Sequence, residues 1–436
     1  MSFLRWLSPG IEVKRWLGLL GVGIAVIGLG LGYVLRDIYD YYTFPEWVYY
    51  ATLQFLPRWV RAVLFLAAGS GLIALGLYKL NRSLLSALQV DYSGAQLLDN
   101  LYRRRYLKRG PRVVAVGGGT GLSTLLRGLK NYTAQITAVV TVADDGGSSG
   151  RLREELGILP PGDIRNCITA LATAEPLMTR LFEYRFKNGG GLEGHSFGNL
   201  FIAALTEVTG SFEKAVLESG RVLAVQGQVL PATLADIQLC AELETGEVIR
   251  GESKIPKHQS RIRRVFLVPP DPPAYAAAVQ AILDADLVVL GPGSLYTSVL
   301  PNLMVSGIRE ALRATRALRV YVCNVATQKG ETDNFTVADH VRTLLDQAGA
   351  GVIDCVLANS LPAKSTHPDW EVIKPEPGGP LPPGIRVVWA PVINERNPHF
   401  HDPDRLARAL LDLYFRHRRS LGRFFPVGVA HRNSGG

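Results

Sequence analysis

Two stretches of the chain combine glycines, hydroxyls and carboxylates in a spacing that suits a phosphorylated ligand. The first is GGGTG at residues 117–121, directly after the apolar run 113–116. The second is DDGGSSGR at residues 144–151. Glycines let a backbone approach a ligand closely, and the free amides at the start of a helix attract anions. The two stretches together predict a phosphate-binding site.

Each stretch follows a predicted strand. The run 113–116 is typical of a strand buried on both faces, and four leucines between 122 and 129 recur at helical spacing. Residues 136–142 predict the next strand, which brings the second stretch to the carboxyl edge of the sheet, where α/β proteins bind ligands. The first stretch matches neither the dinucleotide fingerprint nor a P-loop. For this stretch on its own, a glycine-rich turn without a ligand is the alternative.

Two further polar loops begin predicted helices. Residues 160–166 form a turn in which Asp163 is the predicted N-cap, and Asn166 is placed to face a phosphate or a sugar. Residues 194–200 carry His195, which is either an acid or phosphate donor, or a buried histidine with an ordinary hydrogen bond. The sequence leaves both roles open.

Two more polar loops follow predicted strands. Residues 291–298 offer hydroxyls and Tyr296, whose ring could stack on a base. Residues 323–333 offer Asn324 and also Lys329, which could neutralise a diphosphate. Four or more such loops follow a predicted strand or begin a predicted helix. The sequence therefore predicts a composite nucleotide pocket.

The alternation of strands and helices from residue 112 onward predicts an α/β fold with a doubly wound, mostly parallel sheet. The predicted strands are 112–116, 136–142, 263–268, 286–290, 319–324, 352–357 and 385–389. The predicted helices are 122–131, 163–173, 177–186, 196–208, 212–220, 273–284, 303–314, 336–347 and 403–417. The Pro- and Gly-rich residues 362–384 are predicted to form an excursion without regular structure.

Composition narrows the class of protein. The net charge of +9 favours an anionic partner. The four cysteines are scattered without a C-x-x-C pair, which excludes a disulfide framework and a cysteine-built zinc site and suits a reducing compartment.

The first 80 residues differ from the rest. Residues 16–35 and 62–78 contain no charge and have nearly the length needed to span hydrocarbon. They predict a transmembrane hairpin, although a buried core helix would explain the shorter one. Basic residues precede the first helix of the hairpin and follow the second. Both termini and the main domain are therefore expected on the cytoplasmic side of the cytoplasmic membrane. Glycines in the first helix hint at close helix packing and a homo-oligomer.

The predicted domain organisation follows from these segments. Residues 1–80 form the hairpin, 81–111 a basic juxtamembrane linker, 112–418 the nucleotide-binding domain and 419–436 a tail. The linker either lies on anionic lipid or is an ordinary solvated basic segment. A nucleic-acid partner is not expected so close to a bilayer.

The motifs at 117–130, 141–153, 160–167, 192–200, 285–303 and 323–335 are long and occur in order. They resemble the 2-phospho-L-lactate transferase-like (CofD-like) family, and within it the gluconeogenesis-factor (YvcK-like) branch, over about residues 112–418. The resemblance implies a Rossmann-like domain with helical insertions.

The two branches of the family imply different functions. The transferase branch moves a phospholactyl group from a guanosine-diphosphate-linked donor to a deazaflavin precursor, assisted by Mg²⁺. The gluconeogenesis-factor branch implies a regulator of cell shape and cell-wall synthesis that binds UDP-sugars such as UDP-N-acetylglucosamine. Residues 143–153 and 160–166 match the regulator branch.

The expected site combines the residue patterns with the resemblance. The nucleotide- or phosphate-binding candidates are Gly117, Gly118, Gly119, Thr120, Gly121, Asn166, Asn199, Gly291, Gly293, Ser294, Tyr296, Asn324 and Lys329. Asp144 and Asp145 are the candidate Mg²⁺ ligands, because Mg²⁺ needs few carboxylates when phosphate oxygens complete its shell. For Asp145, capping of the turn at 146–150 is the alternative.

Three hypotheses remain open at this point. The first is a membrane-tethered sensor of a nucleotide sugar that acts on a cell-wall or regulatory protein partner. The second is a transferase that uses a nucleotide-diphosphate donor and Mg²⁺, by positioning and charge neutralisation without a covalent nucleophile. The third is a scaffold whose pocket is no longer used.

Overall fold

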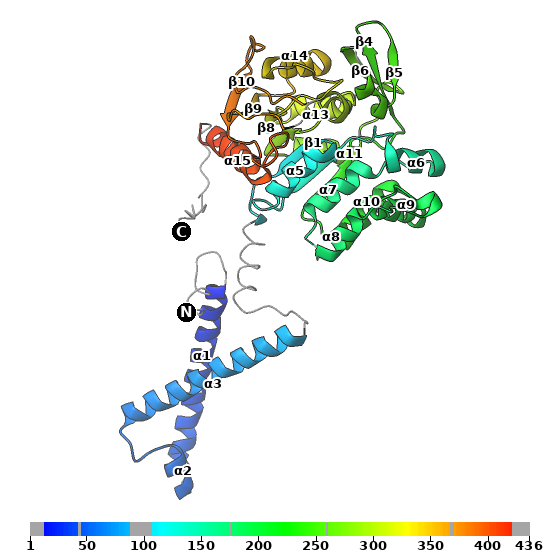
Figure 1. Ribbon diagram of the computed structural model, residues 1–436. Helices are drawn as coiled ribbons and strands as arrows, with labels where there is room; N and C mark the ends of the chain where they lie inside the picture. Colours follow the sequence, from blue (N-terminus) through cyan, green and yellow to red (C-terminus); the bar gives the residue numbers. More distant parts are fainter. Residues whose placement is uncertain are drawn as a thin grey trace. The chain divides into compact units, whose positions relative to one another are not determined.

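Figure 1 shows the computed structural model of the chain, which describes residues 13–41, 45–87, 107–173, 176–258, 260–366 and 370–420. The chain forms two compact units that divide between Arg105 and Tyr106. The linker predicted at 81–111 is therefore divided between the two units. Its residues 88–106 lie outside the described residues. The predicted tail beyond Ser420 also lies outside them.

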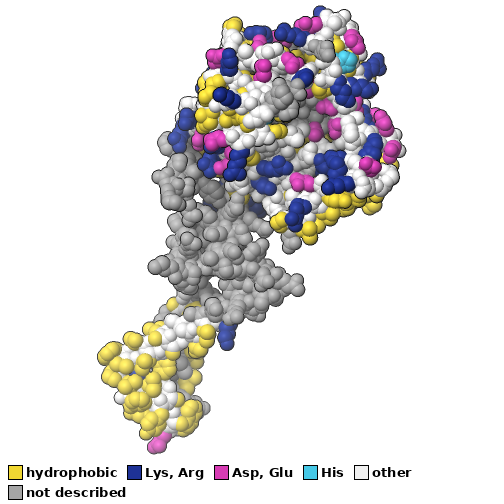
Figure 2. All heavy atoms as spheres, viewed as in Figure 1, with side chains coloured by type: hydrophobic (Ala, Val, Ile, Leu, Met, Phe, Trp, Pro, Cys, Tyr) yellow, Lys and Arg dark blue, Asp and Glu magenta, His cyan; other side chains and the backbone are white. Residues whose placement is uncertain are grey.

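The N-terminal unit consists of α1 (Val13–Tyr41), α2 (Glu46–Ala51) and α3 (Arg58–Ala87). Both predicted spans are thus helical, and hydrophobic side chains cover much of the visible face of this unit (Figure 2). However, a search of the described residues finds no helix that is long and apolar enough to cross a bilayer. The prediction of a transmembrane hairpin at 16–35 and 62–78 is therefore not supported, and neither is the membrane attachment inferred from it. Parts of both spans, residues 16–20 among them, lie outside the described side chains.

The second unit is built on a seven-stranded sheet in the order β10-β9-β8-β7-β1-β2-β3, with every neighbouring pair parallel. Its strands are β1 (Val113–Gly117), β2 (Ile136–Val140), β3 (Gln228–Pro231), β7 (Leu287–Leu290), β8 (Leu318–Val322), β9 (Cys355–Asn359) and β10 (Arg386–Ala390). The central strands β1 and β7 are buried along their whole length. Parallel strands covered on both faces have this continuous apolar character, which is why the sequence located them.

The helices of the second unit are α5 (Gly119–Leu129), α6 (Gly147–Leu156), α7 (Gly162–Leu171), α8 (Pro176–Glu183), α9 (Phe197–Thr209), α10 (Phe212–Val222), α11 (Ala276–Leu283), α12 (Leu300–Leu303), α13 (Ser306–Ala314), α14 (Val337–Ala348) and α15 (Pro403–Ser420). Their main contacts form two sets. Helix α5 packs on α7 and α15, whereas α13 packs on α11 and α12. Two sets of helices are what a doubly wound sheet requires, so the predicted fold class is confirmed for this unit.

One predicted strand has a different partner. Residues 263–268 do form a strand, β6 (Ile262–Val268), but it pairs antiparallel with β4 (Gln238–Leu243) in a separate three-stranded sheet that also contains β5 (Val248–Arg250). The mixed burial of β6 is typical of an antiparallel sheet with one face in water. Strands β3, β4 and β5 were not predicted.

Helix α6 was also not predicted, because its sequence begins with glycines and serines that have low helix propensity. It is held by tertiary contacts at its N-terminus, described below. The predicted excursion at 362–384 contains no helix or strand among its described residues, as expected.

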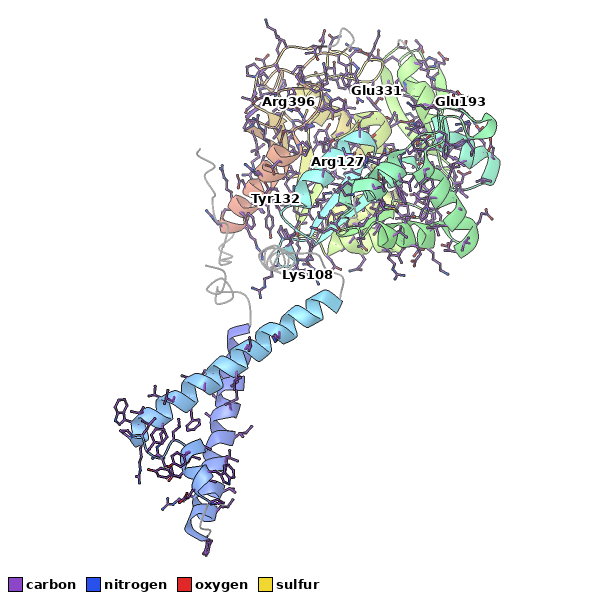
Figure 3. All side chains as sticks on the ribbon, turned by 60° about the horizontal axis from the view of Figure 1, so that its bottom comes forward. Lys108, Arg127, Tyr132, Glu193, Glu331 and Arg396 are labelled. Carbon is purple, nitrogen blue, oxygen red and sulfur yellow. The ribbon has the colours of Figure 1, made fainter. Side chains whose placement is uncertain are left out.

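The C-terminal helix α15 closes the unit by packing on α5. Tyr132, just beyond α5, donates a hydrogen bond of 2.6 Å to Asp404 and accepts one of 2.8 Å from Arg408 (Figure 3). Close approach of the two helices depends on Gly128, where a Cβ would lie 1.9 Å from the carbonyl oxygen of Pro403. Only a glycine fits there without moving one helix.

We therefore expect Gly128→Ala to lower the free energy of unfolding by roughly 1–3 kcal/mol, because the added methyl overpacks the α5–α15 contact. Chemical denaturation followed by circular dichroism measures this. The matched control is Gly220→Ala in α10, where the nearest atom to a Cβ is 3.8 Å away. That change should be neutral or stabilise by roughly 0.5–1 kcal/mol. Equal effects of the two substitutions would contradict the packing explanation.

Candidate functional site

The candidate site lies where β1 and β7 end side by side, since the chain continues in opposite directions across the sheet from these two strands. This is the switch point at which open α/β sheets bind ligands. The loops after the two strands are in contact. The amide of Gly291 donates to the carbonyl of Val116 at 2.8 Å, and a Cβ on Gly121 would lie 2.5 Å from the carbonyl oxygen of Pro292. The two predicted glycine loops thus form one surface.

The amide predicted to meet a phosphate at the start of α5 already has an anionic partner. Gly119 donates its N–H to Oδ2 of Asp163 at 2.8 Å. The prediction of Asp163 as an N-cap is wrong, because α7 has Pro161 at that position. Its carboxylate instead reaches across to α5, since an anion is stabilised at a helix N-terminus. A ligand phosphate cannot take this particular amide without displacing Asp163.

The two adjacent aspartates diverge. Asp144 accepts a 2.9 Å hydrogen bond from the amide of Gly146, and Asp145 accepts one of 2.8 Å from the amide of Ser253. The turn into α6 is therefore held by the first aspartate rather than by the second, so the alternative role considered for Asp145 is wrong. Asp145 instead fixes the segment η3 (Glu252–Lys257) beside the site.

Two glutamates that were not predicted complete an acidic cluster with Asp144 and Asp163. Glu331 is buried, accepts a hydrogen bond from Ser294, and lies 3.4 Å from the hydroxyl of Thr297. Glu252 is hydrogen-bonded to the same Thr297. Glu331 belongs to the polar loop 323–333, and its place after a predicted strand could have indicated a role in the site. Glu252 follows no predicted strand, and only the fold brings it here.

The cluster has a strong effect on proton affinity. Burial and the charge of Asp144 raise the pKa of Asp163 to about 6. Burial, followed by the charges of Asp144, Asp163 and Glu331, raises the pKa of Glu252 to about 8. Burial also raises the pKa of Glu331. Nearby positive charge does not offset the burial of these carboxyls. Such raised pKa values are typical of functional sites.

Carboxylate oxygens are suitable Mg²⁺ ligands, but they do not by themselves form a complete ion site. Across the described part of the chain, no three His, Cys, Asp or Glu side chains are arranged to hold a metal ion. Mg²⁺ commonly uses one or two carboxylates together with phosphate oxygens and water. The donor set therefore fits a Mg²⁺ that arrives with a phosphorylated ligand, with Asp144 as its first candidate.

The remaining predicted residues occupy different positions. Asn166 accepts a hydrogen bond from Arg165, and Asn199 is buried and donates to Ser148 at 3.0 Å. Asn324 is half-buried and Lys329 is exposed on the loop after β8. These positions border the strand ends, and their ligand contacts stay a prediction.

Tyr296 differs most from its predicted role. Its side chain is only 2% exposed, and its ring meets Phe335 edge-on with centroids 6.4 Å apart. Its hydroxyl lies 3.5 Å from the carbonyl of Ile262. A ring so enclosed cannot stack on a base without rearrangement, so Tyr296 instead joins the β7 loop to the small antiparallel sheet.

A polar pocket of about 410 Å³ lies beside this tyrosine. It is bounded by the end of the antiparallel sheet, by α14 and by the loop containing Glu331, which Figure 3 labels. Its charged lining residues are Glu244, Arg261, Arg263, Glu331, Asp333, Asp339, Arg342 and Asp346. Tyr296 and Glu331 form part of its wall and also belong to the β7 side of the site.

His195 is buried and hydrogen-bonded, which fits the plainer of its two predicted roles, and its role as a phosphate donor stays a prediction. Its Nδ1 lies 2.9 Å from the hydroxyl of Ser148, and the imidazole is 3% exposed. The contact joins the start of α9 to the start of α6.

Comparison with known proteins identifies the family. The family described as "2-phospho-L-lactate transferase CofD" matches residues 113–374. The chain belongs to the CofD family. A "Gluconeogenesis factor" of Bacillus subtilis is 48% identical over 317 residues, which cover 70% of this chain and 98% of that protein. A Nostoc protein named "Putative gluconeogenesis factor" is 48% identical over 434 residues, which cover 95% and 93%.

A solved structure gives the same result for the fold. A crystal structure of a Bacillus halodurans protein is 45% identical, with a TM-score of 0.66, and covers 70% of this chain and all of that one. The predicted resemblance to the CofD-like family, with relatives named as gluconeogenesis factors, is therefore confirmed.

The raised pKa of Glu252 predicts a pH-dependent stability. The folded state holds this proton up to about pH 8, whereas an ordinary glutamate releases it near 4.5. Because the folded state binds more protons between these values, its stability falls as the pH rises through that window. Glu252→Gln removes the contribution, so its melting temperature should exceed that of the natural protein at pH 9 and approach it at pH 4.5.

Glu218→Gln in α10 is the control, since its carboxylate is an exposed partner of Arg221. A pH-independent difference for Glu252→Gln, measured by differential scanning calorimetry without divalent cations, would refute the assignment.

Proposed function

We propose that this chain is a regulatory protein that binds a nucleoside diphosphate sugar together with Mg²⁺ at the carboxyl ends of β1 and β7. The observation that carries the proposal is the acidic cluster of Asp144, Asp163, Glu252 and Glu331 beside two glycine loops in contact. Such loops allow a phosphorylated ligand to approach the backbone. The cluster determines which form of that ligand is acceptable.

Charge explains why a cation is needed. A bare diphosphate would add negative charge beside Asp163 and Glu252, whose pKa values are already raised by burial and by neighbouring carboxylates. A Mg²⁺ held by Asp144 would offset this repulsion. When bound, the ion would supply charge neutralisation at the diphosphate, while Gly117–Gly121 and Gly291–Ser294 would hold the ligand through their backbones.

The regulatory role rests on the relatives. Relatives named as gluconeogenesis factors match 95% of this chain in one case and 70% in another. The resemblance adds the expectation of UDP-N-acetylglucosamine as ligand, with cell shape and wall synthesis as the processes regulated. A regulator of this kind would pass its ligand state to a protein partner.

A second function is favoured by one specific observation. Asp163 has a pKa near 6, which suits a general base that accepts a proton from an attacking hydroxyl near neutral pH. Together with the family name, it supports transfer of a phosphorus-containing group from a nucleotide-diphosphate donor as the alternative.

Isothermal calorimetry of the full chain tests the binding proposal. We expect UDP-N-acetylglucosamine to bind with Mg²⁺ and much more weakly with EDTA. Asp144→Asn, which keeps an acceptor for the Gly146 amide, should weaken the Mg²⁺-dependent binding on the order of 10-fold or more. Glu218→Gln should leave it unchanged. Binding that ignores both Mg²⁺ and Asp144→Asn would contradict the proposed arrangement.

Incubation with nucleotide donors separates the two functions. If the chain is a regulator, UDP- and GDP-linked donors should stay intact with Mg²⁺ over a range of hydroxyl acceptors. Release of a nucleoside monophosphate that Asp163→Asn abolishes, without a change in melting temperature, would favour the transferase. Preference for guanosine over uridine ligands would point the same way.

A further inference from the structure

Three arginines gather around the starts of α6 and α9. Arg151 donates to the carbonyl of Glu193 at 2.7 Å, Arg185 donates to the carbonyl of Gly194, and Arg165 donates to Oδ1 of Asn166. Figure 3 labels Glu193, which marks this hairpin of residues 184–197. All these acceptors are neutral, so the hydrogen bonds fix the guanidinium groups without cancelling their charge.

The positive charges oppose one another. The pKa of Arg165 is lowered by burial and then by the charge of Arg185, against weaker opposing effects from Glu183, Asp163 and Asp144. None of the three arginines forms an ion pair with a carboxylate in the described part of the chain, whereas nearby Arg127 and Arg153 do. Arg151 and Arg165 are half-buried and Arg185 is exposed. An anion that joined them would make charge-assisted hydrogen bonds with the guanidinium groups.

A hydrogen-bonded relay beside the arginines directs one further donor. Asn199 donates through Nδ2 to Ser148 Oγ, so the serine proton is free to go to Nδ1 of His195, 2.9 Å away. Burial, then the charge of Arg151, lowers the pKa of His195, which is therefore neutral at pH 7. In the tautomer in which Nδ1 accepts, the single ring proton is on Nε2. No described residue accepts that proton.

The same relay leaves one buried acceptor unsatisfied. Asn199 is 2% exposed, and its Oδ1 has no hydrogen-bond partner among the described residues. A buried oxygen without a hydrogen-bond partner is unfavourable, so a donor at this point would be favoured. The arginines and His195 are suited to bind an anion, and Asn199 Oδ1 is suited to accept a hydrogen bond from a hydroxyl.

We propose that Arg151, Arg165, Arg185, His195 and Asn199 form a second subsite, which takes a phosphate monoester of a polyol. The three guanidinium groups and Nε2 of His195 would bind the phosphate, and a neighbouring hydroxyl of the ligand would donate to Asn199. Only the position of the subsite relative to the nucleotide rests on the proposed function. Arg165 is two residues from Asp163, so the phosphate monoester would lie beside the nucleotide.

Calorimetric titration of the full chain with glycerol 3-phosphate tests this subsite, with inorganic phosphate and glycerol as comparison ligands. We expect glycerol 3-phosphate to bind more tightly than inorganic phosphate, and glycerol not to bind. Arg185→Gln and Arg151→Gln should each weaken glycerol 3-phosphate at least about 10-fold, since each removes a charge-assisted contact. Arg221→Gln, an exposed arginine of α10 paired with Glu218, should change nothing.

Each contrary outcome has a definite meaning. Equal affinity for inorganic phosphate and glycerol 3-phosphate overturns the hydroxyl contact with Asn199. Unchanged binding in both arginine variants, or no binding of glycerol 3-phosphate to the natural protein, overturns the subsite.

A parallel titration with UDP-N-acetylglucosamine and Mg²⁺ keeps the two proposals apart. Arg185→Gln should leave this nucleotide binding unchanged, because Arg185 belongs to the segment 184–197 and not to the loops after β1 and β7. Arginine-dependent binding of glycerol 3-phosphate without any nucleotide binding would refute the proposed function and leave the subsite standing.

Discussion

The hydrogen bond from Gly119 to Asp163 is the interaction on which the site depends. It places a carboxylate at the N-terminus of α5, where the helix would otherwise offer its amide to a ligand. It also requires Gly118, because a Cβ at that position would lie 2.6 Å from the same carboxylate oxygen and 2.8 Å from a methyl of Thr141. One contact thus fixes the start of α5 relative to α7 and explains a glycine whose neighbours leave no space.

Around this contact, carboxylates and guanidinium groups gather near α7. Burial and the charges of Asp144 and Asp163 raise the pKa of Glu252 on η3, while burial and the charge of Arg185 lower the pKa of Arg165. Asp163 and Asp144 act on Arg165 in the opposite sense. The site thus has one group of side chains that favours a cation and another that favours an anion, as a metal-bound phosphate with a second anionic group would require.

The inserted antiparallel sheet makes its own contribution. Through Ser253 it holds Asp145, and through the carbonyl of Ile262 it meets the hydroxyl of Tyr296. The loop after β7 is therefore enclosed by an element that is distant in sequence and not part of the parallel sheet. This enclosure explains both the burial of Tyr296 and the polar pocket beside it.

The sequence by itself determined the parallel strands other than β3, most of the helices and the loops that meet at the β1–β7 edge, because buried strands and amphipathic helices have local periodicities that survive without context. It also led to the family, through long motifs of specific residues. Only the tertiary structure decided which side chains meet. Asp163 proved to be the partner of Gly119 rather than a cap of its own helix, Glu252 came from an insertion to join Glu331, and Tyr296 was buried rather than offered to a ligand. Hydrogen bonds and desolvation act over a few ångströms between residues far apart in sequence, and no local pattern records those distances.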